Sequence, residues 1–221
     1  MVRLAAGLIL LALAGAAGWA YATGWAPSTR KYPLQGVDVS EAQGDIDWTT
    51  VAARGADFAY LRATIGAARR DATFEHNWSA VKAAGLRRGA IHVWSFCQTG
   101  VAQADNFVTV VPRTDDALPA LLDLDFSPDC DARPDRATVI AQLKRFLTIA
   151  ETHTGEPMLL KISKPVARAY HVSAAIGRPV WETGNFFSPD YAARPWRMWQ
   201  ASDMRRVDGI QGPVDWDVVV P

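Results

Sequence analysis

Residues 118–126 read LPALLDLDF, an apolar segment that carries two acidic residues. Side chains of a β-strand alternate between two faces, so the leucines at 122 and 124 fall on one face with Phe126. Asp123 and Asp125 fall on the other face, about 6.6 Å apart along the strand. Two carboxylates on one face cannot both be buried without partners except at a large cost. We therefore predict a strand that packs its apolar face on helices and turns its acidic face into the interior of a barrel.

Two further segments carry acidic residues in the same alternating pattern. In GVDVS (36–40), the valines alternate with Asp38, which is therefore expected to point into the barrel. In VDWDV (214–218), Asp215 and Asp217 fall together on the face opposite to the apolar residues. Barrel enzymes hold their active sites at the carboxyl ends of the strands, so we expect these acids to lie near one another.

From Gly36 onward, short apolar runs alternate with segments of helical periodicity, which is typical of βα repeats. Strands are expected at 36–40, 58–64, 90–96, 120–126, 158–163, 179–182, 197–201 and 214–219. Helices are expected at 74–84, 101–111 and 136–153, the last with Asp135 as N-cap and Gly155 past its end. No G-x-G-x-x-G nucleotide motif follows a strand. The roughly 185 residues of this region are fewer than the ~250 of a typical eightfold barrel. We predict an α/β fold with an irregular (β/α) barrel of TIM-like type.

The N-terminal segment predicts export. Residues 4–21 contain no charge and follow Arg3, as in a signal peptide or a membrane anchor, and 20–22 (AYA) offer a cleavage site. We divide the chain into a signal peptide or signal anchor (1–22), a linker (23–35) and a barrel domain (36–221). Whether the segment is cleaved or retained as an anchor, the domain is expected outside the cytoplasm: secreted, periplasmic, or anchored and facing outward.

Charge and motif spacing exclude several classes of function. The 23 basic and 23 acidic residues give no net charge, which argues against nucleic-acid binding. The four histidines lack the spacing of zinc sites. An exported chain with two cysteines, Cys97 and Cys130, favours a disulfide over a metal site. An open alternative is a Cys97 nucleophile with His92 as its base, although a lone strand histidine is more often a hydrogen-bonded core residue.

The clustered carboxyl groups point to acid catalysis. Neighbouring acids raise one another's pKa, so one can stay protonated while another is ionised, and glycoside hydrolysis needs that division. Two alternatives remain open at this point. Individual acids can serve structure, for example by pairing with Arg62, and an aspartate cluster can also bind Mg²⁺ or Ca²⁺ through oxygen.

Six segments in this order resemble glycoside hydrolase family 25, the lysozymes (N-acetylmuramidases) of peptidoglycan. They are GVDVSEAQGDIDW (36–48), FAYLRATIG (58–66), AGLRRGAIHVWSF (84–96), LPALLDLDF (118–126), PVW (179–181) and WRMWQASDMRRVDGIQGPVDWDVV (196–219). The resemblance implies an irregular β/α barrel and cleavage of the β-1,4 bond after N-acetylmuramic acid. It also implies a Cys97–Cys130 disulfide between two neighbouring loops.

The resemblance assigns site residues and marks departures from the family pattern. Asp38, Asp123 and Asp215 match family acids, and the substrate-binding residues are expected to be Trp199, Gln200, Trp181 and Arg62. The family's general acid is normally Glu, whereas this chain has Asp125. Other cleft positions also differ: Ile65 replaces a Glu, the tyrosine of the fifth strand is replaced by Leu160 or Lys161, and Glu-Thr-Gly-Asn follows Trp181.

Our hypothesis is that Asp125, held neutral by nearby Asp123 and limited solvent, protonates the leaving oxygen while Asp123 stays ionised beside the anomeric centre. Asp38 and Asp215 would complete the floor of the cleft. We expect a monomer that acts on peptidoglycan glycan strands, with no metal or organic cofactor implied. The alternatives are a catalytically impaired glycan-binding barrel and a hydrolase of changed or metal-assisted chemistry.

Overall fold

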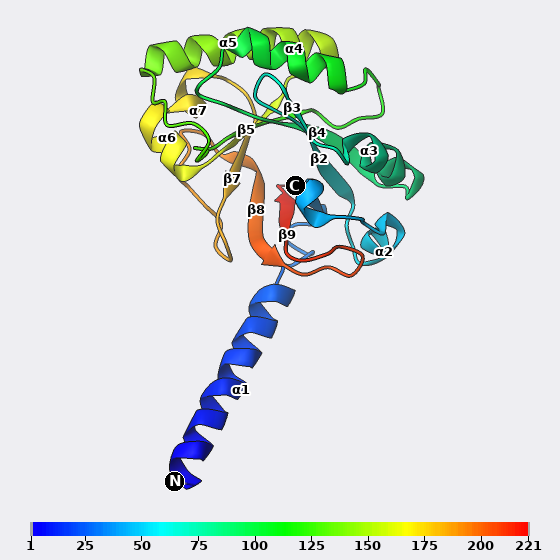
Figure 1. Cartoon of the computed structure of the whole chain (residues 1–221), viewed down its shortest axis with the longest axis vertical. Helices are drawn as coiled ribbons and strands as arrows, with labels where there is room; N and C mark the ends of the chain where they lie inside the picture. The colour runs from blue at the N-terminus through cyan, green and yellow to red at the C-terminus, as the bar shows by residue number, and fades with distance from the viewer. Residues whose placement is uncertain (1, 221) are drawn as a thin grey trace.

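Eight strands close into a barrel in the computed structural model, which describes the backbone of residues 2–220 and the side chains of residues 6–220 (Figure 1). The strands are β1 (Gln35–Val39), β2 (Phe58–Ile65), β4 (Arg87–Val93), β5 (Leu121–Leu124), β6 (Leu159–Ile162), β7 (Val180–Thr183), β8 (Trp196–Arg205) and β9 (Val214–Val219). Neighbours from β1 to β8 pair in parallel, and β9 closes the barrel antiparallel to both β8 and β1. The predicted irregular barrel is confirmed.

Helices cover the first part of the barrel only. They are α2 (Trp48–Ala53), α3 (Phe74–Ala83), α4 (Gly100–Val110), α5 (Arg136–Thr154), α6 (Lys164–Tyr170) and α7 (Val172–Ala175), with a 3-10 turn η1 (Glu41–Gln43) and a short strand β3 (Arg69–Arg70). The predicted ends of α5 are confirmed: Asp135 accepts a hydrogen bond from the amide of Thr138, and Gly155 follows with a φ of 83°. Sequence periodicity did not predict α2, α6 and α7, which are short. In the described part of the chain, no helix lies between β7, β8 and β9.

Two apolar cores lie on the two sides of the barrel wall. The larger one joins the sheet to the surrounding helices. The smaller one fills the interior at the amino ends of the strands, and its members are Phe58, Tyr60, Ile91, Leu121, Leu159, Trp181 and Met198. The hollow part of the interior therefore lies at the carboxyl ends of the strands, as expected for a barrel of this type.

The segment 25–34, which we predicted as a linker, packs against the barrel as a strap. Trp25 and Tyr32 join an aromatic cluster with Trp196 and Trp199 on the outer face of β8. Gln35 fixes the end of the strap by donating to the carbonyl oxygens of residues 27 and 32, at 3.0 and 2.9 Å. The outer face of β8 has no crossover helix, and this strap buries it instead.

The N-terminal helix α1 (Val2–Gly24) projects from the barrel, and its described side chains are almost all exposed (Figure 1). An exposed apolar helix at this position agrees with a signal peptide or anchor. Cys97 and Cys130 form a disulfide between the loops after β4 and β5, with their Cα atoms 5.9 Å apart. The disulfide agrees with export to an oxidising compartment.

Candidate active site

Three aspartates meet around one lysine inside the barrel. Asp38 on β1 lies beside Asp215 on β9, and Asp123 on β5 lies beside Lys161 on β6. The Nζ atom of Lys161 is 2.6 Å from Asp38 Oδ2 and 3.6 Å from Asp215 Oδ2. Alternation along the four strands turns these side chains inward, at the end of the barrel that the apolar plug leaves open.

A cleft opens above this cluster at the carboxyl ends of the strands. It consists of two adjoining hollows of about 280 and 440 Å³. Both hollows are lined by Asp123, Lys161, Asp203 and Asp215. The smaller one extends towards Asp38, Ser40 and Arg62, and the larger one towards Asp125, Ser163, Asn185 and Gln200. The cleft thus joins the four acids that the sequence assigned to catalysis, Asp38, Asp123, Asp125 and Asp215.

Burial and neighbouring charges give the acids of this cluster different pKa values. It raises the pKa of Asp123 to about 6, with Lys161 acting in the opposite sense. Burial and the nearby Asp38 carboxylate raise the pKa of Asp215 to about 8. Although burial acts to lower the pKa of Lys161, Asp38 and Asp215 outweigh it and raise that pKa well above its ordinary value. At neutral pH the cluster therefore holds a protonated Asp215 next to a charged Lys161–Asp38 pair.

Asp217 is the most deeply buried acid of the barrel. It is 0% exposed, and neither of its carboxyl oxygens has a hydrogen-bond partner among the described residues. Burial, with Asp38 nearby, raises its pKa well above the ordinary value. We therefore describe Asp217 as a neutral carboxylic acid below the cleft.

Asp125 differs from the other acids because it lies just past the end of β5 and is exposed. Its Oδ1 atom accepts a hydrogen bond of 2.8 Å from the amide of Phe126. The limited solvent access expected for Asp125 is therefore not found, and of the four candidate acids it is the one that is exposed at the cleft.

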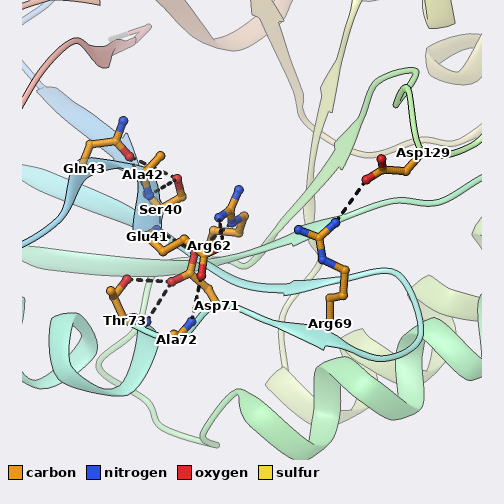
Figure 2. A network of polar contacts seen from close by, with 10 residues as sticks. All are labelled: Ser40, Glu41, Ala42, Gln43, Arg62, Arg69, Asp71, Ala72, Thr73 and Asp129. Carbon is orange, nitrogen blue, oxygen red and sulfur yellow. Dashed lines mark hydrogen bonds and ion pairs between the residues drawn. The ribbon is translucent and has the colours of Figure 1, made fainter.

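Arg62 lies at the edge of the cleft within a network of ion pairs (Figure 2). Its Nε atom is 2.9 Å from Asp71 Oδ2, and one of its terminal nitrogens is 3.1 Å from Glu41 Oε1. Burial acts to raise the pKa of Asp71, but hydrogen bonds from Thr73 and from the Glu41 amide outweigh it and lower that pKa. The ionised Asp71 holds the guanidinium of Arg62 in place, with 24% of its side chain still exposed.

The structure places the predicted aromatic residues away from the cleft surface. Trp181 is 0% exposed and belongs to the apolar plug, where its ring lies 5.2 Å from Lys161 Nζ. Trp199 points outward from β8 into the strap, and its Nε1 atom donates to the carbonyl of Gly184 at 2.7 Å. Gln200, the next residue on β8, lines the cleft. Trp181 and Trp199 thus support the cleft from below and behind, which differs from the expected contact with a ligand.

The alternative roles for His92 and Cys97 are wrong. Cys97 is bonded to Cys130, and His92 is fully buried with its ring between Thr64 and Gln103. Within the described residues, no group of three or more acidic, histidine or cysteine side chains is arranged to hold a metal ion. The ammonium of Lys161 is the cation that contacts Asp38 and Asp215 at the centre of the aspartate cluster.

Sequence reasoning did not assign a role to Lys161 or Asp203. Lys161 is the charged residue of β6, and all four residues of this strand are buried. A lysine within a short apolar strand was therefore the feature of the sequence that could have indicated its role. Asp203 is an exposed residue that exchanges hydrogen bonds with Asn185 at 2.8 and 3.1 Å. That contact joins β8 to the loop after β7. No local sequence pattern predicts it.

The sequence of this chain matches the model of Glycosyl hydrolases family 25 over residues 37–210. Uncharacterized protein YegX of Escherichia coli (strain K12) is 33% identical over 196 residues, covering 85% of this chain and 70% of that protein. Lysozyme M1 of Streptomyces globisporus is 38% identical over 99 residues, covering 43% of this chain and 34% of the lysozyme.

Solved structures of similar proteins have the same fold. A family 25 glycosyl hydrolase from Bacillus anthracis superposes with a TM-score of 0.80 and 29% identity, covering 88% of this chain and 91% of that one. The bacterial lysozyme from Streptomyces coelicolor superposes with a TM-score of 0.76 and 28% identity, covering 84% of this chain and 91% of that one.

Proposed function

The chain belongs to Glycosyl hydrolases family 25, and from this premise we propose that it is a peptidoglycan hydrolase of the lysozyme (N-acetylmuramidase) type. The bond cleaved would be the β-1,4 bond between N-acetylmuramic acid and N-acetylglucosamine. The observation that carries the proposal is the convergence of Asp38, Asp123, Asp125 and Asp215 in one cleft at the carboxyl ends of the barrel strands. The similarity to two lysozymes supports the choice of substrate.

In this proposal Asp125 is the proton donor. Its exposed carboxyl group stands at the cleft surface, within the reach of a glycosidic oxygen. The proton passes to that oxygen as its bond to the anomeric carbon breaks, and water supplies the hydroxyl group of the new reducing end. The leaving sugar departs as a neutral alcohol.

Asp123 stabilises the positive charge that develops at the anomeric carbon, or orients the acetamido group of the sugar. It lies below Asp125, and its pKa of about 6 keeps it mostly ionised at neutral pH. The Lys161–Asp38 pair and the protonated Asp215 form a hydrogen-bonding floor with little net charge. A negative carboxylate near the anomeric centre stabilises the transition state more than the neutral ground state.

A second candidate function is glycan binding with weak turnover or with a changed substrate. The family's general acid is normally Glu, and aspartate withdraws the carboxyl group by one methylene. A displacement of about 1 Å at a catalytic group can cost on the order of 10²-fold in rate. The hydrogen bond from the Phe126 amide also directs one oxygen of Asp125 back to its own backbone.

The test measures release of new reducing-end muramic acid from purified peptidoglycan by the full chain in detergent. Wild type, Asp125→Glu and Asp125→Asn are compared, with the exposed Asp131→Asn as the matched control. Activity in wild type and Asp131→Asn that is lost in Asp125→Asn supports a muramidase with an aspartic acid donor. Activity that appears only in Asp125→Glu favours the glycan-binding alternative. Activity that survives Asp125→Asn contradicts the proposed donor.

A further inference from the structure

The strap runs along the outside of β8 from the cleft end of the barrel to the opposite end. Just before the strap begins, the carbonyl of Thr23 in the last turn of α1 accepts a hydrogen bond of 2.8 Å from the amide of Arg206, directly after β8 ends. At its other end, Tyr32 packs on Trp196, where β8 begins. Because β8 ends at the rim that holds the cleft, the helix α1 that precedes the strap leaves the barrel at that rim.

Trp25, the residue after α1, packs on the outer face of β8 and on the loop after β7. Trp25 lies 5.1 Å from Phe186 and 6.4 Å from Trp199, measured between ring centroids. Phe186 has a left-handed φ of 67°, unusual for a residue other than glycine, and belongs to the loop that supplies Gly184 and Asn185 to the cleft. Figure 1 shows α1 leaving beside the end of β8 and pointing away from the barrel. The exit of α1 and the mouth of the cleft therefore share one end of the molecule.

The composition of α1 fits a bilayer. Its span Ala6–Gly24 has 19 residues, a mean hydropathy of 1.6 and 6% burial. At 1.5 Å per residue such a helix is about 28 Å long, close to the ~30 Å of the hydrocarbon core. Trp19 and Tyr21 are 60% and 68% exposed near its C-terminal end, where aromatic side chains of spanning helices meet the membrane surface.

A second exposed aromatic residue lies beside the exit of α1. Phe187 is 82% exposed and follows Phe186 in the loop that contacts Trp25. A single exposed apolar side chain is common on protein surfaces, so Phe187 matters here only for its position next to the exit of α1. A bilayer that holds α1 would lie against the same end of the barrel as Phe187.

We propose that α1 remains in the membrane and that the strap holds the cleft facing the bilayer surface. The partner of this end of the barrel is then the lipid bilayer, and the cleft receives glycan strands that lie next to the membrane. The nature of the glycan rests on the proposed function, whereas the orientation does not. Thr23 is buried and Gly24 is exposed, and the strap that follows Gly24 is held on the outer face of β8 by Trp25 and Tyr32.

The test reads the depth of two single-cysteine labels in the full chain, reconstituted in vesicles of phosphatidylethanolamine and phosphatidylglycerol. Phe187→Cys reports the cleft end, and the exposed Glu156→Cys, before β6 at the opposite end, is the matched control. The two native cysteines are bonded to each other, so the fluorophore reacts only with the introduced thiol. Spin-labelled lipids then quench the fluorophore according to its distance from the bilayer.

We expect quenching at position 187 to exceed that at position 156 several-fold. A flexible Gly/Ser segment inserted between Gly24 and Trp25 should bring the two values close together, since it separates the anchor from the strap. Equal quenching at both positions without the insertion would overturn the proposal. It would also be overturned if the chain isolated from a bacterial membrane fraction proved to have lost residues 1–22 by mass. Neither the quenching nor the mass measurement requires hydrolysis. A failure of this proposal can therefore be distinguished from a failure in the muramic acid assay.

Discussion

Two clusters of buried polar side chains lie on opposite sides of the barrel wall, and they are built differently. On the outer side, His92 is enclosed by aromatic residues of α4 and α5, and its ring nitrogens lie 2.7 Å from Thr64 Oγ1 and 3.3 Å from Gln103 Oε1. On the inner side, neither carboxyl oxygen of Asp217 has a hydrogen-bond partner among the residues that the structure describes, and Lys161 is shared by more than one carboxylate.

We interpret the outer cluster as structural and propose a catalytic role for the inner one. Burial lowers the pKa of His92 to about 3, so its ring is neutral and both nitrogens are paired. In the barrel, burial raises the pKa of Asp123 and Asp215 to about 6 and 8, and the acids outnumber the nearby cation. A fold that only needed stability would pair or replace such groups, so clustered acids with raised pKa values indicate chemistry.

The largest expected effect comes from removing the charge of Asp123. Asp123→Asn keeps the size of the side chain but cannot stabilise a cationic transition state, and we expect release of muramic acid to fall by roughly 10²–10⁴-fold. The melting temperature above pH 6 should be unchanged or higher, because the fold no longer has to hold an ionised buried carboxylate. Asp131→Asn is the control. An unchanged rate in Asp123→Asn would assign that acid to structure.

Replacing Lys161 tests the charge balance of the inner cluster. Lys161→Met leaves Asp38 without its partner, which for a buried pair costs about 3–5 kcal/mol of unfolding free energy. It also removes the charge that lowers the pKa of Asp123, so the acid limb of the activity profile should move from near pH 6 to higher pH.

Lys161→Arg keeps the charge and is the matched control for this variant. Its activity profile should stay close to that of wild type in rate assays from pH 5 to 8. If Lys161→Met and Lys161→Arg shift the profile equally, the shape of the side chain rather than its charge governs the site.

Sequence alternation predicted the strands and the inward acids because a strand places every second side chain on one face. It placed Asp38, Asp123 and Asp215 in the cleft that the structure describes. Local sequence patterns did not predict the surroundings of side chains whose contacts come from residues distant along the chain. Trp199 is an example, since what buries it is the strap, far away in sequence.

The ionisation of Asp217 provides the next test of the inner cluster. Its pKa is raised, so from about pH 4 upward the unfolded chain is ionised at this position while the folded chain is not, and wild-type stability falls as pH rises. Asp217→Asn does not titrate, so its stability relative to wild type should rise with pH, by at most about 1.4 kcal/mol per pH unit, until the folded wild type also ionises. Urea unfolding at pH 5, 6 and 7 measures the difference. A constant difference across these pH values would mean that Asp217 is paired and charged in the fold.

The smallest effect is expected from a substitution of His92 in the outer cluster. Its effect on unfolding free energy should depend on pH in the opposite sense to that of Asp217→Asn. His92→Phe fills the site but leaves Thr64 and Gln103 without their ring partners, which costs about 1–3 kcal/mol at pH 7. Below pH 6.5 the unfolded chain protonates His92 while the folded chain does not, so wild type loses stability down to about pH 3 and the variant does not. The gap between them should therefore close at about 1.4 kcal/mol per pH unit as pH falls, in urea unfolding at pH 7, 6 and 5. Muramic acid release per folded molecule should stay at the wild-type rate, because His92 lies outside the barrel wall. A loss of activity in this variant would mean that the outer cluster also serves the cleft.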